Sequence, residues 1–463
     1  MEIDTRAGLD ARQRNTALLV AGCFFMEMLD GTIVTTAAPA LGASLGVAPT
    51  AVGLVITAYL LTLAVFIPLS GWLTARFGPR RVFLTAIALF TLASVGCAAS
   101  TNLTELVALR VLQGLGGALM VPVGRLVVLA RTAKPDIPRV ISYIVWPGLL
   151  APVVAPVLGG VITTYWSWHW LFLINIPLGA LAFAVAWRLV RDDRAGAAVP
   201  PLDWAGVALT CLGLGGLTYA AHLVSESVGG WPAVAATGAG SLALLGLAAR
   251  HLLRTEHPLL DLRALRVATL RASVVGGSLY WIVVGAVPFL LTLMFQDAFG
   301  WSPVRSGAVV LFVFVGNIAI KPATTYLLNR FGLRALLIGS TAAMTATVAG
   351  CGFLTGATPL AVIAAVVLAS GVARSVGLTG YTTIAFADIP PAHMRQANTL
   401  SATATQVATG LGVAAATVAL RIGELVPGDA YRVAFLLLSL VTVAAMVGAL
   451  RLGRTAGDAV RTR

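Results

Sequence analysis

Long apolar runs, each about twenty residues in length, recur throughout this 463-residue chain and are separated by short segments that carry most of its charges. An apolar helix of about 20 residues spans the hydrocarbon core of a bilayer. The runs lack the period-2 alternation of barrel strands, so they predict an all-α polytopic membrane protein. The expected fourteen spans are 16–38, 51–71, 82–100, 103–125, 140–163, 171–189, 204–224, 232–252, 272–295, 306–326, 335–355, 359–381, 396–420 and 432–450.

Charged residues make up 11% of the chain, against about 25% in a typical soluble domain, and 58% of the residues are hydrophobic. The net charge of +13 could indicate nucleic-acid binding, but that function needs a basic face on a folded soluble domain. No connection between the spans is long enough for such a domain. The basic residues are therefore interpreted as membrane-topology signals, and no nucleic-acid partner is expected.

The basic residues alternate with the spans. They are Arg6, Arg12 and Arg14 before the first span, Arg76, Arg80 and Arg81 after the second, Arg131, Lys134 and Arg139 after the fourth, Arg188, Arg191 and Arg194 after the sixth, and a similar series further on. The opposite connections carry mainly Arg305, Arg421 and Arg432. The positive-inside rule then places both termini, 1–15 and 453–463, in the cytoplasm. Residues 1–15 have mixed charge and do not resemble a cleavable signal peptide.

An internal repeat divides the chain. A shift of 254 positions places 46–80 over 300–334 without a gap, and glycines, prolines and loop arginines match in register. The matched pairs include Gly46 with Gly300, Pro68 with Pro322, Gly78 with Gly332 and Arg80 with Arg334. Both copies run in the same direction, which predicts a parallel repeat about an axis along the membrane normal. The expected domains are a six-helix half at 16–190, a linker with two helices at 191–270, and a second six-helix half at 271–452.

Two carboxylates, Glu27 and Asp30, lie inside the first span and share one helical face. A charge at the centre of a spanning helix costs about 2.5–3.5 kcal/mol, so such a residue usually faces a partner or a pathway. At a helical rise of about 1.5 Å per residue, Arg110 in the fourth span and Asp30 in the first span lie at similar depths in the membrane. These depths permit a contact between the two side chains, directly or through Gln113. Asp30 and Arg110 could form a static ion pair. Alternatively, burial and a nearby cation could poise Asp30 to gain and lose a proton.

The second half offers cations in place of acids. Arg374 is the preferred cavity residue, whereas Lys321 lies near the end of its span and is expected to snorkel toward the interface. Further polar and aromatic residues could line the cavity, or could bridge and pack helices. These candidates are Gln113, Asn317, Gln406, Tyr59 and Trp146. Because the spans hold few acids and several arginines, we expect neutral, zwitterionic or anionic substrates.

Several motifs resemble those of the major facilitator superfamily. The segment from Gly71 to Arg81 is similar to its loop between the second and third spans, and 110–118 is similar to its fourth-span motif. Residues 151–160 resemble the fifth-span motif of its exporters, while 29–34 and 168–177 resemble the fourteen-span drug:proton antiporters. The resemblance implies two six-helix halves with two inserted helices. It further implies proton-coupled export of amphipathic compounds by a protein that functions as a monomer in the bacterial inner membrane.

Two of these motifs also have a physical interpretation. In the loop, Gly78 permits the turn, while Arg76, Arg80 and Arg81 are expected to meet anionic lipids and nearby helix C-termini. Gly71 belongs to the same gating loop, and the acid usual in the family is replaced by Ala75. In the fifth span, prolines bend the helix and glycines permit close packing, which suits a flexing helix. These residues are Pro152, Pro156, Gly159 and Gly160.

Two functions other than multidrug export by an antiporter are compatible with the sequence. A dedicated exporter of one endogenous product or self-made antibiotic is the nearest alternative, and a sensor that does not transport belongs to a different class. The fifth-span motif argues against an uptake symporter. The chain has no Walker-type loop for ATP and no arrangement of residues typical of catalysis, and its four cysteines lie within apolar runs. Neither an enzymatic activity nor a cofactor or metal is therefore expected.

Overall fold

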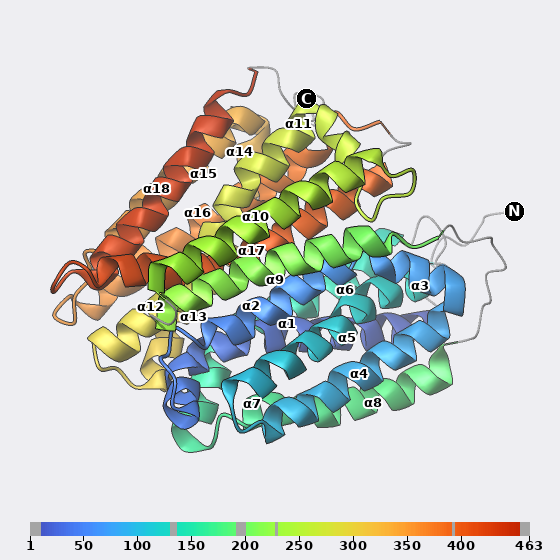
Figure 1. Cartoon of the computed structure of the whole chain (residues 1–463), viewed down its shortest axis with the longest axis horizontal. Coiled ribbons are helices and arrows are strands. Elements are labelled where there is room, and N and C mark those ends of the chain that lie inside the picture. Colours follow the sequence, from blue (N-terminus) through green and yellow to red (C-terminus); the bar gives the residue numbers. More distant parts are fainter. Residues whose placement is uncertain (1–10, 130–136, 191–200, 227–229, 391–393, 454–463) are drawn as a thin grey trace, which may run out of the picture.

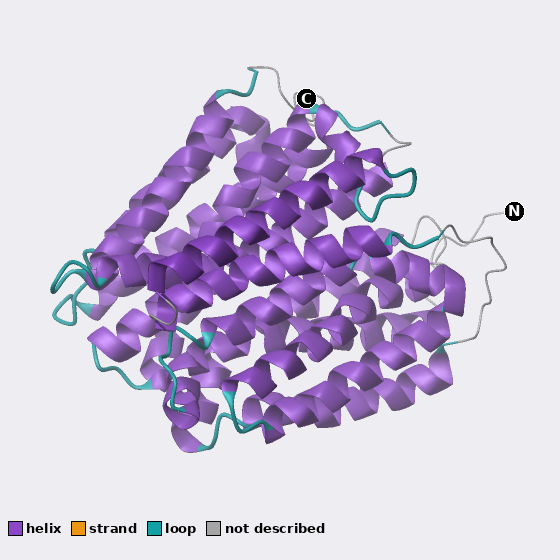
Figure 2. Ribbon diagram, viewed as in Figure 1, coloured by secondary structure: helices purple, strands orange, loops and turns teal. Residues whose placement is uncertain are grey.

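The computed structural model describes residues 11–129, 137–190, 201–226, 230–390 and 394–453, and this part is helical without any strand (Figure 2). The outer parts of both expected tails, and the basic residues Arg6, Arg131, Lys134, Arg191 and Arg194, lie outside it. The helices are α1 (Ala11–Leu45), α2 (Gly53–Phe66), α3 (Leu69–Phe77), α4 (Pro79–Ala99), α5 (Leu103–Leu129), α6 (Ile137–Tyr165), α7 (Trp170–Leu173), α8 (Asn175–Leu189), α9 (Trp204–Glu226), α10 (Gly230–Arg254), η2 (Leu262–Arg266), α11 (Ala268–Arg271), η3 (Ala272–Gly276), α12 (Gly277–Leu293), η4 (Met294–Ala298), α13 (Pro303–Ala319), α14 (Lys321–Phe331), α15 (Leu333–Cys351), α16 (Leu360–Phe386), α17 (Met394–Gly423) and α18 (Ala430–Leu450).

Every expected span coincides with a helical segment. Among the described residues, twelve helices are long and apolar enough to cross a membrane, and the pair α2 and α3, bent by 58°, makes a thirteenth. The apolar part of α6, Leu150–Tyr165, is shorter than a full span. The chain is therefore a multi-pass membrane protein. The count of fourteen spans is compatible with this structure and stays a prediction.

The helices pack as two bundles with a helix pair beside them (Figure 1). In the first bundle α1 packs against α6, and α4 packs against α5 and α8. In the second bundle α12 packs against α17, α13 against α16, and α15 against α18. The inserted helices α9 and α10 pack against each other, and α9 also contacts α2 and α17, one from each bundle. The domain limits 16–190, 191–270 and 271–452 stay a prediction of the repeat.

One carboxylate joins the two inserted helices. Asp203, just before α9, accepts hydrogen bonds from the backbone N–H groups of Gly206 (2.8 Å) and Leu259 (3.1 Å), and its Oδ1 lies 2.7 Å from His251 Nε2 in α10. Burial tends to raise the pKa of Asp203, but the bonds from Gly206, His251 and Leu259 outweigh it and hold that pKa below its usual value. The ionised carboxylate thus ties α9 to α10.

The backbone explains why the repeat keeps its glycines. Gly46 and Gly300 have φ values of 68° and 63°, and Gly78 and Gly332 have φ values of 85° and 78°. A residue with a Cβ is strained at positive φ, so glycine is favoured at all four positions. Gly78 separates α3 from α4, and Gly332 separates α14 from α15 in the same way. The two halves therefore share these turns as well as their sequence pattern.

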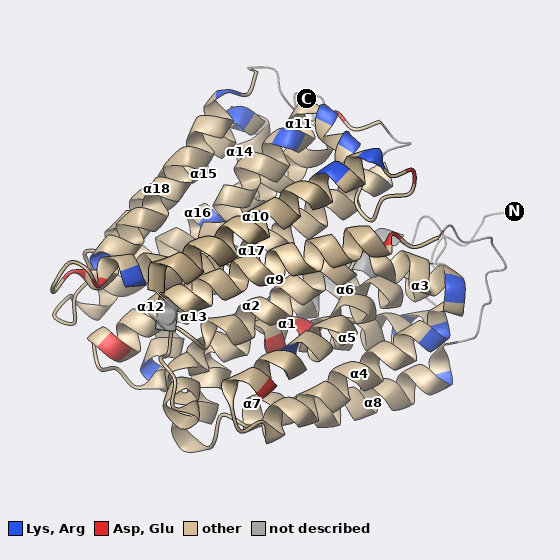
Figure 3. Cartoon of the chain, in the orientation of Figure 1, with Lys and Arg blue, Asp and Glu red and all other residues tan. Residues whose placement is uncertain are grey.

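Loop arginines cap the last helix of each bundle. Arg80 Nη2 donates to the carbonyl oxygen of Trp187 at 3.0 Å, at the end of α8, and the matched Arg334 Nη2 donates to that of Leu450 at 2.9 Å, at the end of α18. The last carbonyls of a helix lack partners within the helix, and a cation is favoured there. The expected contact with helix C-termini is thus confirmed for Arg80. Figure 3 shows Lys and Arg gathered mainly toward the end of the molecule where the termini lie.

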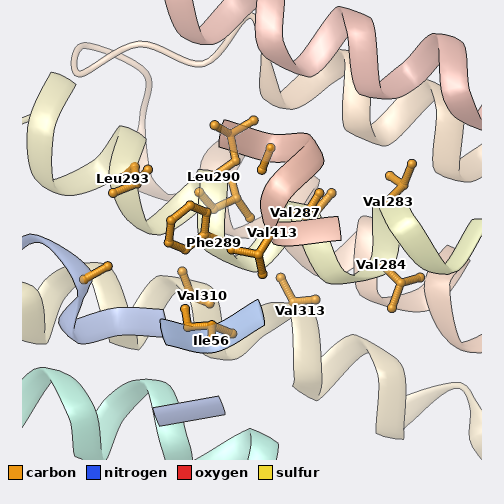
Figure 4. Packing of buried hydrophobic residues seen from close by; sticks show 14 of the residues in the cluster. Ile56, Val283, Val284, Val287, Phe289, Leu290, Leu293, Val310, Val313 and Val413 are labelled. Carbon is orange, nitrogen blue, oxygen red and sulfur yellow. The ribbon is translucent and has the colours of Figure 1, made fainter. Parts of the chain in front are cut away.

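We call that end the terminus side. The two bundles meet toward the opposite side, where Thr57 Oγ1 donates to the carbonyl oxygen of Gly410 at 3.2 Å and Gln296 Nε2 to that of Thr36 at 2.9 Å. Figure 4 shows Ile56 of α2 close to apolar side chains of the second bundle. In Figure 1 the bundles converge at this end and diverge toward the terminus side. The halves are thus joined at one side of the molecule.

Glycines permit the closest approach between the bundles. A Cβ on Gly160 of α6 would lie 2.5 Å from the carbonyl oxygen of Pro303, and one on Gly307 of α13 would lie 2.1 Å from that of Pro156. Real Cβ atoms do not approach backbone atoms so closely, so α6 and α13 can pack this tightly only with glycine at both positions.

We predict that Gly307→Ala separates α6 from α13 and lowers stability by about 1–3 kcal/mol, the usual cost of overpacking. Thermal unfolding of the purified protein in detergent measures the effect. Gly339→Ala in α15 is the matched control, because its Cβ would meet nothing within 4 Å. Equal unfolding midpoints for the two variants would contradict the tight joint.

Candidate functional site

A buried ion pair lies at the centre of the first bundle. Asp30 of α1 and Arg110 of α5 are joined by a direct bond from Arg110 Nη1 to Asp30 Oδ2, and both side chains are fully inaccessible to solvent. Two charges buried in this way are stable only when further hydrogen bonds satisfy the remaining polar atoms. The contact predicted from helix depth is therefore present, and its surroundings decide whether it is stable.

Amide side chains complete the shell of Asp30. Gln113 Nε2 donates to Asp30 Oδ1 at 3.0 Å, and Asn175 Nδ2 of α8 donates to the same oxygen at 2.7 Å. Gln113 also accepts from Arg110 Nη1 at 2.7 Å and donates to Ser94 Oγ of α4 at 2.8 Å. Both oxygens of Asp30 thus have charged or amide donors. Four helices, α1, α4, α5 and α8, supply this network, so both routes between Asp30 and Arg110, direct and through Gln113, are present.

Aromatic rings enclose the guanidinium of Arg110. Its Cζ lies 4.1 Å from the ring centroid of Tyr59 in α2 and 5.7 Å from that of Phe172 in α7. Its Nε donates to the carbonyl oxygen of Val55 at 3.3 Å, whereas Nη2 is buried without a hydrogen-bond partner. A cation over an aromatic face is stabilised by the ring quadrupole, and more so where water is excluded. Tyr59 and Gln113 are therefore parts of the Asp30 cluster.

Glu27 lies one turn before Asp30 in a different environment. Its side chain is buried, and its Oε2 has no hydrogen-bond partner. The charges that act on Glu27 are those of Arg125 and Asp30, and the Cζ of Arg125 lies 5.1 Å from the ring centroid of Phe24. Asp30 thus accepts hydrogen bonds at both carboxylate oxygens, whereas Glu27 keeps one oxygen without a donor.

The remaining predicted residues lie elsewhere. Asn317, Arg374 and Gln406 are half-buried in α13, α16 and α17 of the second bundle, and the side chain of Trp146 in α6 lies outside the described part. Arg76 and Arg81 are exposed, and a Cβ on Gly71 would meet nothing. The structure therefore separates the cavity candidates into those of the Asp30 cluster and those of the second bundle, and their roles stay predictions.

The fifth-span motif lies in α6. A Cβ on Gly159 would lie 2.9 Å from the carbonyl oxygen of Ile33, so α6 packs tightly against α1 as well as α13. Pro152 and Pro156 lie inside this helix, where each removes a backbone donor. The motif thus lies where α6 packs against α1 of its own bundle and against α13 of the other bundle.

Sequence reasoning missed three residues of the site, namely Ser94, Asn175 and Arg125. Asn175 stands inside the motif at 168–177 as a polar residue in an apolar run, and that position was its available signal. Ser94 and Arg125 gave no signal beyond their polarity. Among the described residues, no group of three or more His, Cys, Asp or Glu could hold a metal ion.

The comparison with known families decides the classification. Residues 20–413 match the family model described as Major Facilitator Superfamily. The chain belongs to the major facilitator superfamily. The resemblance seen in its motifs is thereby confirmed.

Relatives agree with this assignment. The chain is 37% identical over 412 residues to MdtD of Cronobacter sakazakii, named as a multidrug resistance protein, with 86% of this chain and 84% of that protein covered. It is 32% identical over 455 residues to HsrA of Haemophilus influenzae, named as a transport protein, with 97% and 98% covered. Among solved structures, a D-xylose–proton symporter has a TM-score of 0.67 at 15% identity, covering 96% of this chain and 98% of that one, which shows a common fold.

We predict that Asp30→Asn destabilises the protein by about 3–5 kcal/mol, because it leaves Arg110 buried without its counter-charge. Arg110→Gln should cost a similar amount, and the double variant should lose less than the sum of the two. Thermal unfolding in detergent provides the double-mutant cycle.

The exposed pair Arg421 and Glu424 is the matched control, with an expected coupling of about 0–1 kcal/mol. Strictly additive effects of Asp30→Asn and Arg110→Gln would show that the pair is not coupled.

Proposed function

We propose that this transporter exports small amphipathic organic compounds in exchange for protons, with both termini in the cytoplasm of a bacterial cell. The observation that carries the proposal is the Asp30–Arg110 pair, an ionisable carboxylate held inside the membrane by a four-helix network. Such a residue is costly in a membrane, and proton relays are among its established uses. The relatives named as multidrug resistance proteins support export of drugs.

Proton exchange would act on this network. A proton taken up by Asp30 removes the negative charge that balances Arg110, so the direct bond weakens. Gln113 and Asn175 can follow the change because an amide offers both a donor and an acceptor. Since these side chains come from α5 and α8, a change of charge on α1 alters how three helices pack. Glu27, with its free acceptor one turn away, is the second proton-exchanging group that we propose.

Alternating access would use the joint between the bundles. If the termini are cytoplasmic, the bundles are closed at the outer face in this structure and diverge toward the cytoplasm, where a substrate for export enters. Opening the outer face requires α6 to move against α13. Pro152, Pro156, Gly159 and Gly160 are the residues that we propose for this flexing helix.

The other partners follow from charge. The arginines of the terminus side would contact anionic lipid headgroups, and the positive-inside rule is the basis for placing that side in the cytoplasm. We propose that the protein functions as a monomer, because one chain supplies both bundles.

The second candidate function is a dedicated exporter of one endogenous product. It shares the same proton site, so the breadth of substrates separates it from a multidrug pump. Susceptibility of a knockout strain to chemically unrelated compounds measures that breadth, and a loss of resistance to a single compound would favour the dedicated exporter.

The test of proton coupling is dye-reported proton movement in everted vesicles across a compound panel. Wild type should release protons from the acidified lumen when substrate is added. Asp30→Asn should abolish this release, and Glu27→Gln should reduce it several-fold, with each signal normalised to folded protein in the vesicles.

Glu105→Gln is the matched control, because Glu105 is exposed at the start of α5 and bonds only to nearby loop groups. It should retain the wild-type signal. Full proton release by a variant in which both Asp30 and Glu27 are amides would overturn the mechanism.

A further inference from the structure

The second bundle contains an arginine whose charge is not balanced by the chain. Arg374 lies in the middle of α16, and its Nε and Nη1 are out of solvent without a hydrogen-bond partner. The acidic residues between 272 and 450 all lie at or beyond helix ends. They are Asp297, Asp388, Glu424 and Asp429. Arg374 is half-buried as a residue, but two of its three guanidinium nitrogens have neither solvent nor an acceptor, which is costly, so an anion from outside the chain would complete the site.

The first bundle contains an arginine whose charge is balanced by an acid. Arg110 and Arg374 both come from the fourth span of their half, and each lies over an aromatic ring from the second span. The Cζ–centroid distances are 4.1 Å to Tyr59 and 5.1 Å to Phe314. In the first half the counter-charge, Asp30, comes from the first span. The second half thus also places a cation from its fourth span over a ring from its second span, although Arg374 lies ten positions further along the repeat than Arg110.

The first span of the second half brings no acid to Arg374. The first span of the second half, α12, brings Tyr280 to this region, where its hydroxyl donates to the carbonyl oxygen of Ala373 at 2.8 Å. Tyr280 is therefore satisfied by the backbone next to Arg374 and adds no negative charge. Arg374 keeps its unfilled donors.

A second polar group lies on the helix that supplies the ring. Asn317 follows Phe314 by three residues, so the two share one face of α13. Its Oδ1 is buried without a hydrogen-bond partner. An amide can rotate to present its N–H₂ group, which donates to an anion. Arg374, Asn317 and Phe314 together therefore offer charged and neutral donors beside an apolar surface.

We propose that Arg374, supported by Asn317, binds the anionic group of the transported compound, so that amphipathic organic anions are its preferred substrates. The guanidinium forms paired hydrogen bonds with a carboxylate, sulfonate or phosphate, and the ring of Phe314 contacts the apolar body. Arg374 lies about 20 Å along α16 from the opposite side, toward the side where the bundles diverge. This inference rests on the proposed export function and names its substrate class.

The test uses two probes that differ in one charge. Dansyl-phenylalanine has a carboxylate, and dansyl-phenylalanine amide is its neutral counterpart. The full-length protein in detergent should bind the carboxylate about 10–150-fold more tightly, because a hydrogen bond to a charged group contributes about 1.5–3 kcal/mol. Dansyl fluorescence measures both affinities.

Variants identify the residue responsible. Arg374→Gln should abolish the preference, and Arg374→Lys should keep part of it because lysine retains the charge without the planar fork. Asn317→Asp should also abolish it, since an internal carboxylate would pair with Arg374. Arg432→Gln is the control, because Arg432 is exposed beside Asp429 at the opposite side. Equal affinity of wild type for both probes, or a preference unchanged by Asn317→Asp, would overturn the inference.

Two further measurements distinguish a transported compound from an inorganic ion or a lipid headgroup as the bound anion. Replacing chloride by gluconate should leave the preference unchanged, and added phosphatidylglycerol should not displace the dansyl carboxylate. Displacement by chloride or by the lipid would assign the site to an inorganic ion or a headgroup and overturn the substrate assignment. If a neutral drug releases protons from the vesicles but the two probes bind equally, the export proposal stands and the anion preference is wrong. If the probes bind with an Arg374-dependent preference but no proton release occurs, the anion preference stands and proton-coupled export is wrong.

Discussion

The ion pair between Asp30 and Arg110 is the interaction on which the first bundle depends. Two opposite charges without solvent need hydrogen bonds to their remaining donors and acceptors, and this network supplies them to all but Arg110 Nη2 and Asn175 Oδ1. That requirement explains why Gln113, Asn175 and Ser94 converge from three further helical positions, and why Tyr59 and Phe172 enclose the guanidinium. Because the polar partners of Asp30 and Arg110 come from α4, α5 and α8, the chemistry of one carboxylate on α1 is coupled to the packing of four helices.

The two halves share a backbone plan but differ in their polar chemistry. Glycines at positive φ and loop arginines that cap the last helix occur in both halves. The first half balances its buried arginine with an acid from its own first span, whereas the first span of the second half contains no acid and Arg374 keeps Nε and Nη1 unpaired. A repeated scaffold has thus acquired one internally neutral site and one site that is electrostatically incomplete.

The joint between the bundles depends on small residues. Gly160 and Gly307 permit backbone contacts between α6 and α13 that no side chain could tolerate, and Thr57 bonds to the backbone of α17. Without a hydrophobic driving force in lipid, such close packing and hydrogen bonding hold helices together. The same closeness makes the joint sensitive to movement of α6, one of the helices that pack across the two bundles.

The sequence alone was sufficient to predict the positions of the helical segments and the repeat, and to show that helix depth permits a contact between Asp30 and Arg110. Each follows from a property that can be counted residue by residue along the chain, namely the length of an apolar run, the presence of a charge in the membrane and the depth of a residue along a helix. Only the tertiary structure decided that Asn175 and Ser94 complete the shell of Asp30, that Arg125 is a neighbour of Glu27, and which side of the molecule joins the halves. The direction in which a side chain leaves a bundled helix depends on how its neighbours pack, and that packing cannot be counted along one chain segment.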